Sequence, residues 1–138
     1  MSKTLTVIGA TGLQGSSVVL AALESSAGWR VRAITRNPAS SAAQALQAKG
    51  VEVVKADLNE SSTLNKAFED SYAIFASTDF FGPFGALGAD AQKAMELEWT
   101  QTNNIIQAAL ACESLRHFVW STLPHASRIS KEIGRAHV

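Results

Sequence analysis

Three glycines near the start of the chain have the spacing of a phosphate-binding loop. Gly9, Gly12 and Gly15 follow a short apolar run and open a helical one. We expect Gly9 to allow a tight turn, Gly12 to let a pyrophosphate approach the backbone, and Gly15 to let the helix pack closely on the sheet. Backbone N–H groups at a helix N-terminus bind phosphate oxygens. The predicted loop contacts are Gly9, Ala10, Thr11, Gly12, Leu13, Gln14 and Gly15.

Apolar and helical patterns alternate along the rest of the chain. Short apolar runs predict buried parallel strands at 5–8, 31–34, 51–54, 72–76 and 117–120. Helical patterns separate them at 13–25, 39–49, 62–70 and 89–112. We therefore predict an α/β fold with a doubly wound parallel sheet (Rossmann-like), strand order 3-2-1-4-5 and a ligand crevice between strands 1 and 4. This context favours a dinucleotide loop over the alternative, a glycine-rich turn without a ligand.

The end of the second strand carries an arginine where NAD-binding domains carry an acid. A carboxylate there holds the ribose 2′-hydroxyl and would repel a 2′-phosphate. This chain has Thr35-Arg36-Asn37, and the Arg36 guanidinium can hold a 2′-phosphate through two hydrogen bonds. The alternative is that Arg36 is a solvated loop residue. The segment favours NADP as the cofactor, with NAD as the alternative.

Two further strand ends should face the same crevice. Asp57 follows the third strand, where it can reach the adenine edge while Leu58 covers the ring. An N-cap role for Asp57 in the next helix fits equally well. Thr78 and Asp79 end the fourth strand and should lie near the ribose and nicotinamide. Glycines and phenylalanines at 79–88 predict a mobile loop, either a lid over the nicotinamide pocket or, as we favour, a surface that packs on a further domain.

Composition excludes several classes of function. Lysine plus arginine and aspartate plus glutamate number 12 each, so the chain lacks the net positive charge of a nonspecific nucleic-acid binder. The single cysteine, Cys112, excludes a disulfide framework, and no metal-ligand spacing occurs. The apolar stretch before Gly9 is too short for a signal peptide or a membrane span. We expect a protein of the cytoplasm, or of the nucleus, without membrane contact.

Four sequence blocks carry a family resemblance. They are V-I-G-A-T-G-L-Q-G, V-R-A-I-T-R-N-P, V-K-A-D-L and the strand ending Phe118-Val119-Trp120-Ser121. In this order, over residues 3–130, the chain resembles the NmrA-like family of atypical short-chain dehydrogenases. The T-R-N-P segment and the W-S-T-L-P ending are most similar to the fungal members.

The resemblance implies an NAD(P)-binding Rossmann domain followed by a small substrate or partner domain. It implies that Gly9 to Gln14 bind the pyrophosphate and Arg36 the 2′-phosphate. It further implies adenine contacts from Asp57 and Leu58, and nicotinamide ribose contacts from Thr78, Asp79 and Phe80. Some members are redox-sensing regulators that bind a protein partner, and others reduce quinones or small carbonyls.

The chain departs from this pattern at the catalytic positions. Some relatives place a lysine early in the helix before the fifth strand, where this chain has Thr100. Short-chain dehydrogenases use a Tyr-x-x-x-Lys pair, but the only tyrosine, Tyr72, lies inside a strand and no such pair occurs. Ser121 ends the fifth strand, where it either polarises a substrate or has a capping or turn role. Whether the protein is an enzyme is left open.

The last residues, I-G-R-A-H-V, match what a common sequencing adapter encodes in one frame. We expect 1–131 to be an incomplete Rossmann domain, truncated after its fifth strand, and 132–138 to be a non-native tail; a genuine C-terminus is the alternative. The leading hypothesis is an NADP(H)-binding regulator whose cofactor occupancy controls a protein partner. The alternatives are an NADP-dependent reductase of a small carbonyl or quinone, and a non-functional fragment.

Overall fold

Five parallel strands form the centre of the computed structural model, which describes residues 2–123, 128 and 129. The strands are β1 (Thr4–Ile8), β2 (Arg30–Thr35), β3 (Glu52–Lys55), β4 (Ser71–Ser77) and β5 (His117–Ser121). They form one sheet in the order β3-β2-β1-β4-β5, and all four pairings are parallel. The predicted fold class and strand order are confirmed. The tail predicted at 132–138 lies outside the described residues.

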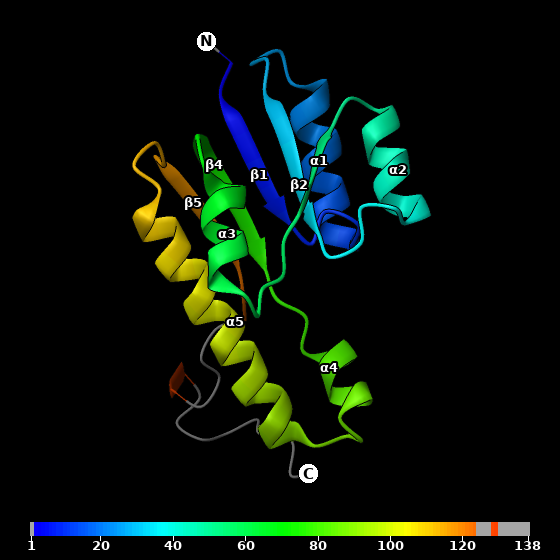
Figure 1. The fold of residues 1–138 in the computed structure, drawn as a ribbon, viewed down its shortest axis with the longest axis vertical. Helices are drawn as coiled ribbons and strands as arrows, with labels where there is room; N and C mark the ends of the chain where they lie inside the picture. The colour runs from blue at the N-terminus through cyan, green and yellow to red at the C-terminus, as the bar shows by residue number, and fades with distance from the viewer. Residues whose placement is uncertain (1, 124–127, 130–138) are drawn as a thin grey trace.

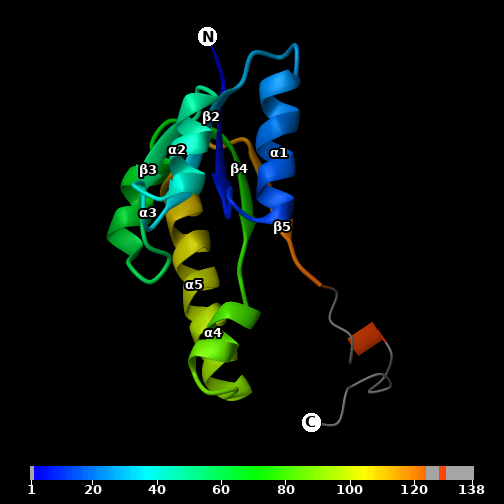
Figure 2. The same ribbon diagram turned by 90° about the vertical axis from the view of Figure 1, so that its right-hand side faces the viewer.

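Helices cover both faces of this sheet (Figures 1 and 2). They are α1 (Leu13–Glu24), α2 (Ser41–Ala48), α3 (Ser61–Phe68), α4 (Phe81–Ala86) and α5 (Ala91–Ala111). Figure 2 shows α1 on one face and α3 and α5 on the other. In Figure 1, α4 and the first half of α5 stand beyond the carboxyl ends of the strands.

Two apolar clusters hold the layers together. The central strands read as continuous apolar runs because both of their faces are covered. On the α3 and α5 face, buried Phe68, Leu64 and Ile105 pack against Ile8 and Ile74 of the sheet. The other face carries its own cluster, which contains Val7, Ala10, Val19, Ala22, Val31, Ala33 and Val51. The sheet is therefore a rigid frame for the loops at its carboxyl edge.

The segment predicted as a mobile loop contains a short helix instead. Asp79 Oδ1 accepts a hydrogen bond from the Gly82 N–H at 3.2 Å, which satisfies a donor in the first turn of α4. The Phe80 and Phe84 rings stack with centroids 5.5 Å apart, as residues at i and i+4 of a helix can. The loop prediction for 81–86 is wrong because this cap and ring pair outweigh the low helix propensity of glycine.

Hydrogen bonds internal to the protein join the elements at the amino end of the sheet. The buried hydroxyls of Thr6 and Ser71 lie 2.6 Å apart and bond β1 to β4. Arg32 donates to the carbonyls of Ala67 and Glu69 at the C-terminus of α3, where a cation is favoured. These contacts place α3 and fix the start of β4.

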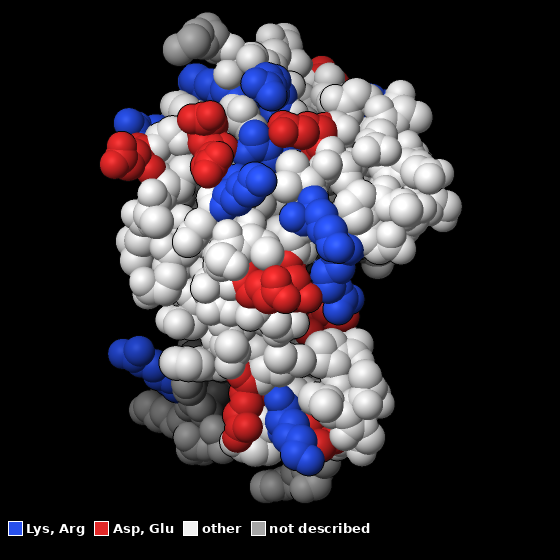
Figure 3. Space-filling view, in the orientation of Figure 1, with Lys and Arg blue, Asp and Glu red and all other residues white. Residues whose placement is uncertain are grey.

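The surface carries charges of both signs. On the face in Figure 3, basic and acidic side chains lie side by side, without a continuous basic area. Arg30 and Arg32, for example, both form ion pairs with Glu52. Among the described residues, no helix is long and apolar enough to cross a membrane, and no group of histidine, cysteine and acidic side chains could hold a metal ion.

Candidate dinucleotide-binding site

The glycine loop forms a tight turn between β1 and α1. Gly9 has a φ of +71°, a left-handed conformation that favours glycine, and a Cβ there would lie 2.8 Å from Ser77 Oγ. A Cβ on Gly15 would overlap the carbonyl group of Gly9. The sequence predictions of a tight turn at Gly9 and of close packing at Gly15 are therefore confirmed.

The N-terminus of α1 lacks the side-chain cap found at two other helices. Its N-cap residue is Gly12, which has no side chain to accept a hydrogen bond. By contrast, Ser40 Oγ caps α2 and Asp90 Oδ1 caps α5. The first N–H groups of a helix have no partners within it, and its dipole makes this end positive. An anion can therefore be bound between Gly12 and the first turn of α1.

Arg36 lies beside this loop at the end of the neighbouring strand. Ile8 of β1 is paired with Ile34 of β2, so the chain leaves both strands at the same edge of the sheet. Asn37 N–H donates to Thr35 Oγ1 at 3.1 Å, which fixes the turn around Arg36. The Arg36 side chain is exposed and makes no hydrogen bond or ion pair within residues 2–123. Its guanidinium is available to an anion.

Asp57 forms a local turn instead of capping the next helix. Its Oδ1 accepts hydrogen bonds from both the backbone and the side-chain N–H of Asn59, each at 2.9 Å. The N-cap position of α3 is Glu60, so the alternative N-cap role of Asp57 is wrong. Leu58 packs against the core, and its carbonyl accepts a bond from Asn104 Nδ2 of α5. Both residues lie past the end of β3, as expected.

Beyond β4, the structure reveals an acidic residue that sequence reasoning missed. Thr78 Oγ1 donates to Glu98 Oε1 of α5 at 2.6 Å, and both side chains are half-buried. Asp79 is exposed and used at the start of α4, while Phe80 is half-buried against Phe84. No local pattern indicated Glu98, because its partner is 20 residues away in the sequence.

Ser121 is connected to the glycine loop. Its Oγ donates to Gln14 Oε1 at 2.5 Å and so joins the end of β5 to the first turn of α1. Both residues line a cavity of about 480 Å³ together with Leu13, Ser17, Val18 and Phe75. The alternative of a capping or turn role for Ser121 is not what the structure shows. This bond places Ser121 beside the first turn of α1.

The other catalytic candidates lie away from this edge or are engaged in their own helix. Tyr72 is near the amino end of β4, where its ring is 5.4 Å from His117 and 4.4 Å from Lys3 Nζ. Thr100, at the position where some relatives carry a lysine, donates to the Glu96 carbonyl. Within the described residues, neither provides an acid or base at the carboxyl edge.

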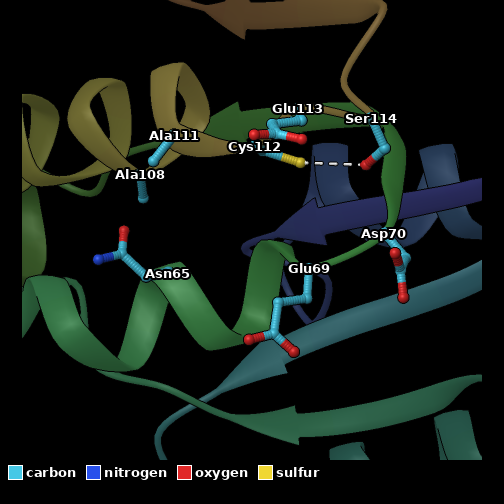
Figure 4. Close-up of a pocket in the computed structure, with 8 residues that line it drawn as sticks. All are labelled: Asn65, Glu69, Asp70, Ala108, Ala111, Cys112, Glu113 and Ser114. Atoms are coloured by element: carbon cyan, nitrogen blue, oxygen red, sulfur yellow. Dashed lines mark hydrogen bonds between the residues drawn. The ribbon is translucent and has the colours of Figure 1, made fainter.

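A larger hollow, of about 700 Å³, lies at the amino end of β4 and β5 (Figure 4). Cys112 at the end of α5 contacts Ser114 Oγ at 3.3 Å and the Phe68 carbonyl at 3.0 Å. Ser114 Oγ in turn donates to the Ser71 carbonyl. Half-buried Cys112 packs against the core as a small apolar side chain. These groups stabilise the turns that precede the strands.

The carboxyl edge thus has the form of a Rossmann-type dinucleotide site, with a glycine loop, an uncapped helix and a strand order that reverses between β1 and β4. The NmrA-like family model matches residues 1–137, and the chain belongs to this family. It is 37% identical over 131 residues to the NmrA-like family domain-containing oxidoreductase cpsB of Aspergillus campestris. That match covers 94% of this chain but 37% of cpsB, so the chain spans about a third of that relative.

Two solved structures share the fold of this chain. The negative transcriptional regulator NmrA in complex with NAD superposes with a TM-score of 0.73 at 24% identity, over 92% of this chain and 35% of that one. The NADPH-dependent quinone oxidoreductase QOR2 of Escherichia coli, complexed with NADPH, gives a TM-score of 0.66 at 27% identity, over 89% of this chain and 38% of that one.

Proposed function

We propose that this chain is the dinucleotide-binding part of an NADP(H)-dependent protein, with the pyrophosphate on the loop from Gly9 to Gly15. The main support for the proposal is the close approach of Gly15 to the Gly9 carbonyl group. A Cβ on Gly15 would overlap that carbonyl, so the glycine lets the start of α1 lie against the end of β1. The uncapped start of α1 and Arg36, which has no partner among the described residues 2–123, support it as two sources of positive potential at one edge. The same features suit NAD less well, because position 36 carries an arginine and not the acidic residue that would hold the ribose 2′-hydroxyl of NAD.

The remaining contacts follow the order of the strands. We place adenine at Asp57 and Leu58 beyond β3, and the nicotinamide ribose at Thr78, Asp79 and Phe80 beyond β4. A reduced nicotinamide bound this way supplies hydride to an acceptor. Ser121 would then position or polarise the acceptor beside the loop, since it already contacts Gln14.

For the whole protein we propose a reductase of a small organic acceptor in the cytoplasm or nucleus. The support is that the fungal relatives, cpsB among them, are called oxidoreductases. A redox-sensing regulator of a protein partner is the second candidate, and the likeness in fold to the regulator NmrA favours it. Steady oxidation of NADPH by the full-length protein with a carbonyl and quinone panel would support the reductase. Cofactor binding without turnover would support the regulator.

Titration with NADPH and NADH tests the cofactor assignment. Nicotinamide fluorescence of the reduced cofactor gives a Kd for each, and we expect NADPH to bind at least tenfold more tightly. Arg36→Ala should weaken NADPH binding by roughly tenfold and leave NADH unchanged, because a bidentate charged hydrogen bond is lost. Arg116→Ala is the matched control, since it removes the same charge from an exposed residue that bonds only nearby carbonyls.

Two outcomes would contradict this assignment. Equal affinity for the two cofactors, or an Arg36→Ala variant that binds NADPH as the parent does, would remove the 2′-phosphate role. A folded chain that binds neither cofactor would favour the third hypothesis, a non-functional fragment.

A further inference from the structure

A second cavity at the carboxyl edge lies between α5 and β5. Its volume is about 440 Å³, and it is lined by Thr78, Glu98, Trp99, Thr102, Ile106, Phe118, Trp120 and Thr122. Thr78 and Thr122 follow the carboxyl ends of β4 and β5, so the cavity adjoins the proposed nicotinamide position. Figure 1 shows α5 running beside β5 and past its end. A molecule bound here would lie next to the cofactor.

Aromatic rings form the walls of this cavity. Phe118 and Trp120 are alternate residues of β5, so their side chains share the α5 face of the sheet. Their rings stack with centroids 5.9 Å apart. Trp99, on α5, is 71% exposed and adds a third ring whose surface is not used in the core. Ring faces of this kind bind flat apolar molecules and attract cations.

One carboxylate stands among these rings. Of the eight lining residues, all of them described, only Glu98 is charged. The hydrogen bond from Thr78 Oγ1 holds one carboxylate oxygen, so the Glu98 side chain has a defined position on the cavity wall. Two of the other lining groups, Thr102 and Thr122, are neutral hydroxyls. The cavity therefore combines a fixed negative charge with aromatic faces, which complements a planar cation and opposes negative charge developing on a substrate oxygen.

We propose that this cavity binds the substrate as a planar organic cation, an iminium ion, with Glu98 as its counter-ion. The substrate class rests on the proposed NADP(H)-dependent reduction, whereas the binding of a planar cation does not. An iminium carbon accepts hydride, a C–H bond forms, and the C=N π pair becomes the lone pair of a neutral amine. A reduced nicotinamide held by Thr78, Asp79 and Phe80 would supply this hydride with its electron pair and would be left oxidised. No proton is transferred in this step, so it needs no tyrosine acid.

Titration without dinucleotide tests the cavity independently of the cofactor. The probes are N-methylquinolinium and its uncharged isostere 1-methylnaphthalene, followed through the indole N–H signals of Trp99 and Trp120, with Trp29 as an internal reference outside the cavity. We expect the cation to bind roughly tenfold more tightly than the isostere. Glu98→Gln should bring the two Kd values together. Glu96→Gln, which removes the same charge from an exposed position on α5, should preserve the difference.

A second measurement covers the case in which Glu98→Gln unfolds. In the parent chain, raising NaCl from 50 to 500 mM should weaken binding of the cation and not that of the isostere. Equal binding of the two probes, a preference that survives Glu98→Gln, or binding of the cation that ignores salt would overturn the proposal. A merely structural Thr78–Glu98 bond would change stability in Glu98→Gln without changing the preference for charge. Cation binding in a chain that fails to bind NADPH would leave this cavity assignment standing and refute the proposed function.

Discussion

The two ends of the parallel sheet use polar side chains differently. At the amino end, Thr6 and Ser71 bond to each other, and Ser114 and Cys112 bond to nearby carbonyls. At the carboxyl end, Thr78 is bonded to Glu98 and Ser121 to Gln14. However, the exposed Arg36 side chain makes no hydrogen bond or ion pair within residues 2–123, and the Gly12 N-cap offers the backbone N–H groups of α1 no side-chain acceptor. Paired groups stabilise a fold, while unpaired groups held in a rigid frame can bind a ligand. We therefore expect the amino end to be structural and the free groups of the carboxyl end to bind the ligand.

An assignment by cavity volume alone would place the binding site at the amino end of the sheet and not at the carboxyl end. The hollow at the amino end, about 700 Å³, exceeds the cavities of about 440 and 480 Å³ at the carboxyl end. Its cysteine and serine bond to each other, as Figure 4 shows, and each also bonds to a backbone carbonyl, Cys112 to that of Phe68 and Ser114 to that of Ser71. Availability of hydrogen-bonding groups distinguishes the two ends better than volume does.

Gly15→Ala should give the largest effect on the carboxyl end. The new Cβ would overlap the Gly9 carbonyl and push α1 away from β1, at a cost of about 1–3 kcal/mol in unfolding free energy. We also expect NADPH affinity to fall more than tenfold, as measured by urea unfolding and cofactor fluorescence. Gly85→Ala, where a Cβ meets nothing within 4 Å, is the control: it should leave NADPH affinity unchanged and should not lower the unfolding free energy, because alanine has the higher helix propensity in α4. Unchanged NADPH binding in Gly15→Ala would show that the close approach is not needed.

Ser71→Ala should test the structural role of the amino end. The buried Thr6 hydroxyl would lose its partner, at a cost of about 1–3 kcal/mol in unfolding free energy. NADPH affinity should stay within twofold of the parent in the same titration. A Ser71→Ala variant of full stability but weak NADPH binding would break the division between the two ends. Thr6→Val together with Ser71→Ala should recover part of the loss, because no buried hydroxyl is then unpaired.

Ser121→Ala should have the smallest effect on stability. Its bond to Gln14 is exposed, so we expect a loss of about 0.5–1 kcal/mol in urea unfolding. NADPH affinity should change less than threefold. If Ser121 positions an acceptor, turnover in the full-length protein should fall much more than cofactor affinity. Equal losses in both would assign Ser121 to the cofactor loop alone.

Most of the fold was predictable from local patterns. The apolar runs predicted the bounds of every strand of the sheet to within two residues. The glycine after the first run marked the end of the first strand. The helix α4 was missed because its glycines and Pro83 resemble a loop. The spacing of Phe80 and Phe84 was a signal that could have indicated one helical turn. Whether this spacing indicates a helix depends also on the hydrogen bond from the Gly82 N–H to Asp79 Oδ1, which helix propensities do not take into account.

The site was only partly predictable, for a physical reason. The roles of Gly9 and Gly15 in the turn were predictable because they follow from local sterics. The location of Arg36 at the carboxyl edge was predictable because it directly follows a strand. The bonds of Thr78 to Glu98 and of Ser121 to Gln14 join segments 20 and 107 residues apart. Such pairs arise only when tertiary packing brings two elements to one edge.

The central position of β1 also affects the order in which the chain can fold during synthesis. β1 leaves the ribosome first, but its two neighbours are β2 and β4, and β4 ends only at Ser77. Elongation at roughly 5–20 residues per second leaves about 2–8 s between the end of β2 and the end of β4. During this interval one edge of β1, with buried Val7 and Ile8, has no partner strand. The nascent chain therefore exposes this edge of β1 to chaperones and to aggregation until β4 has emerged.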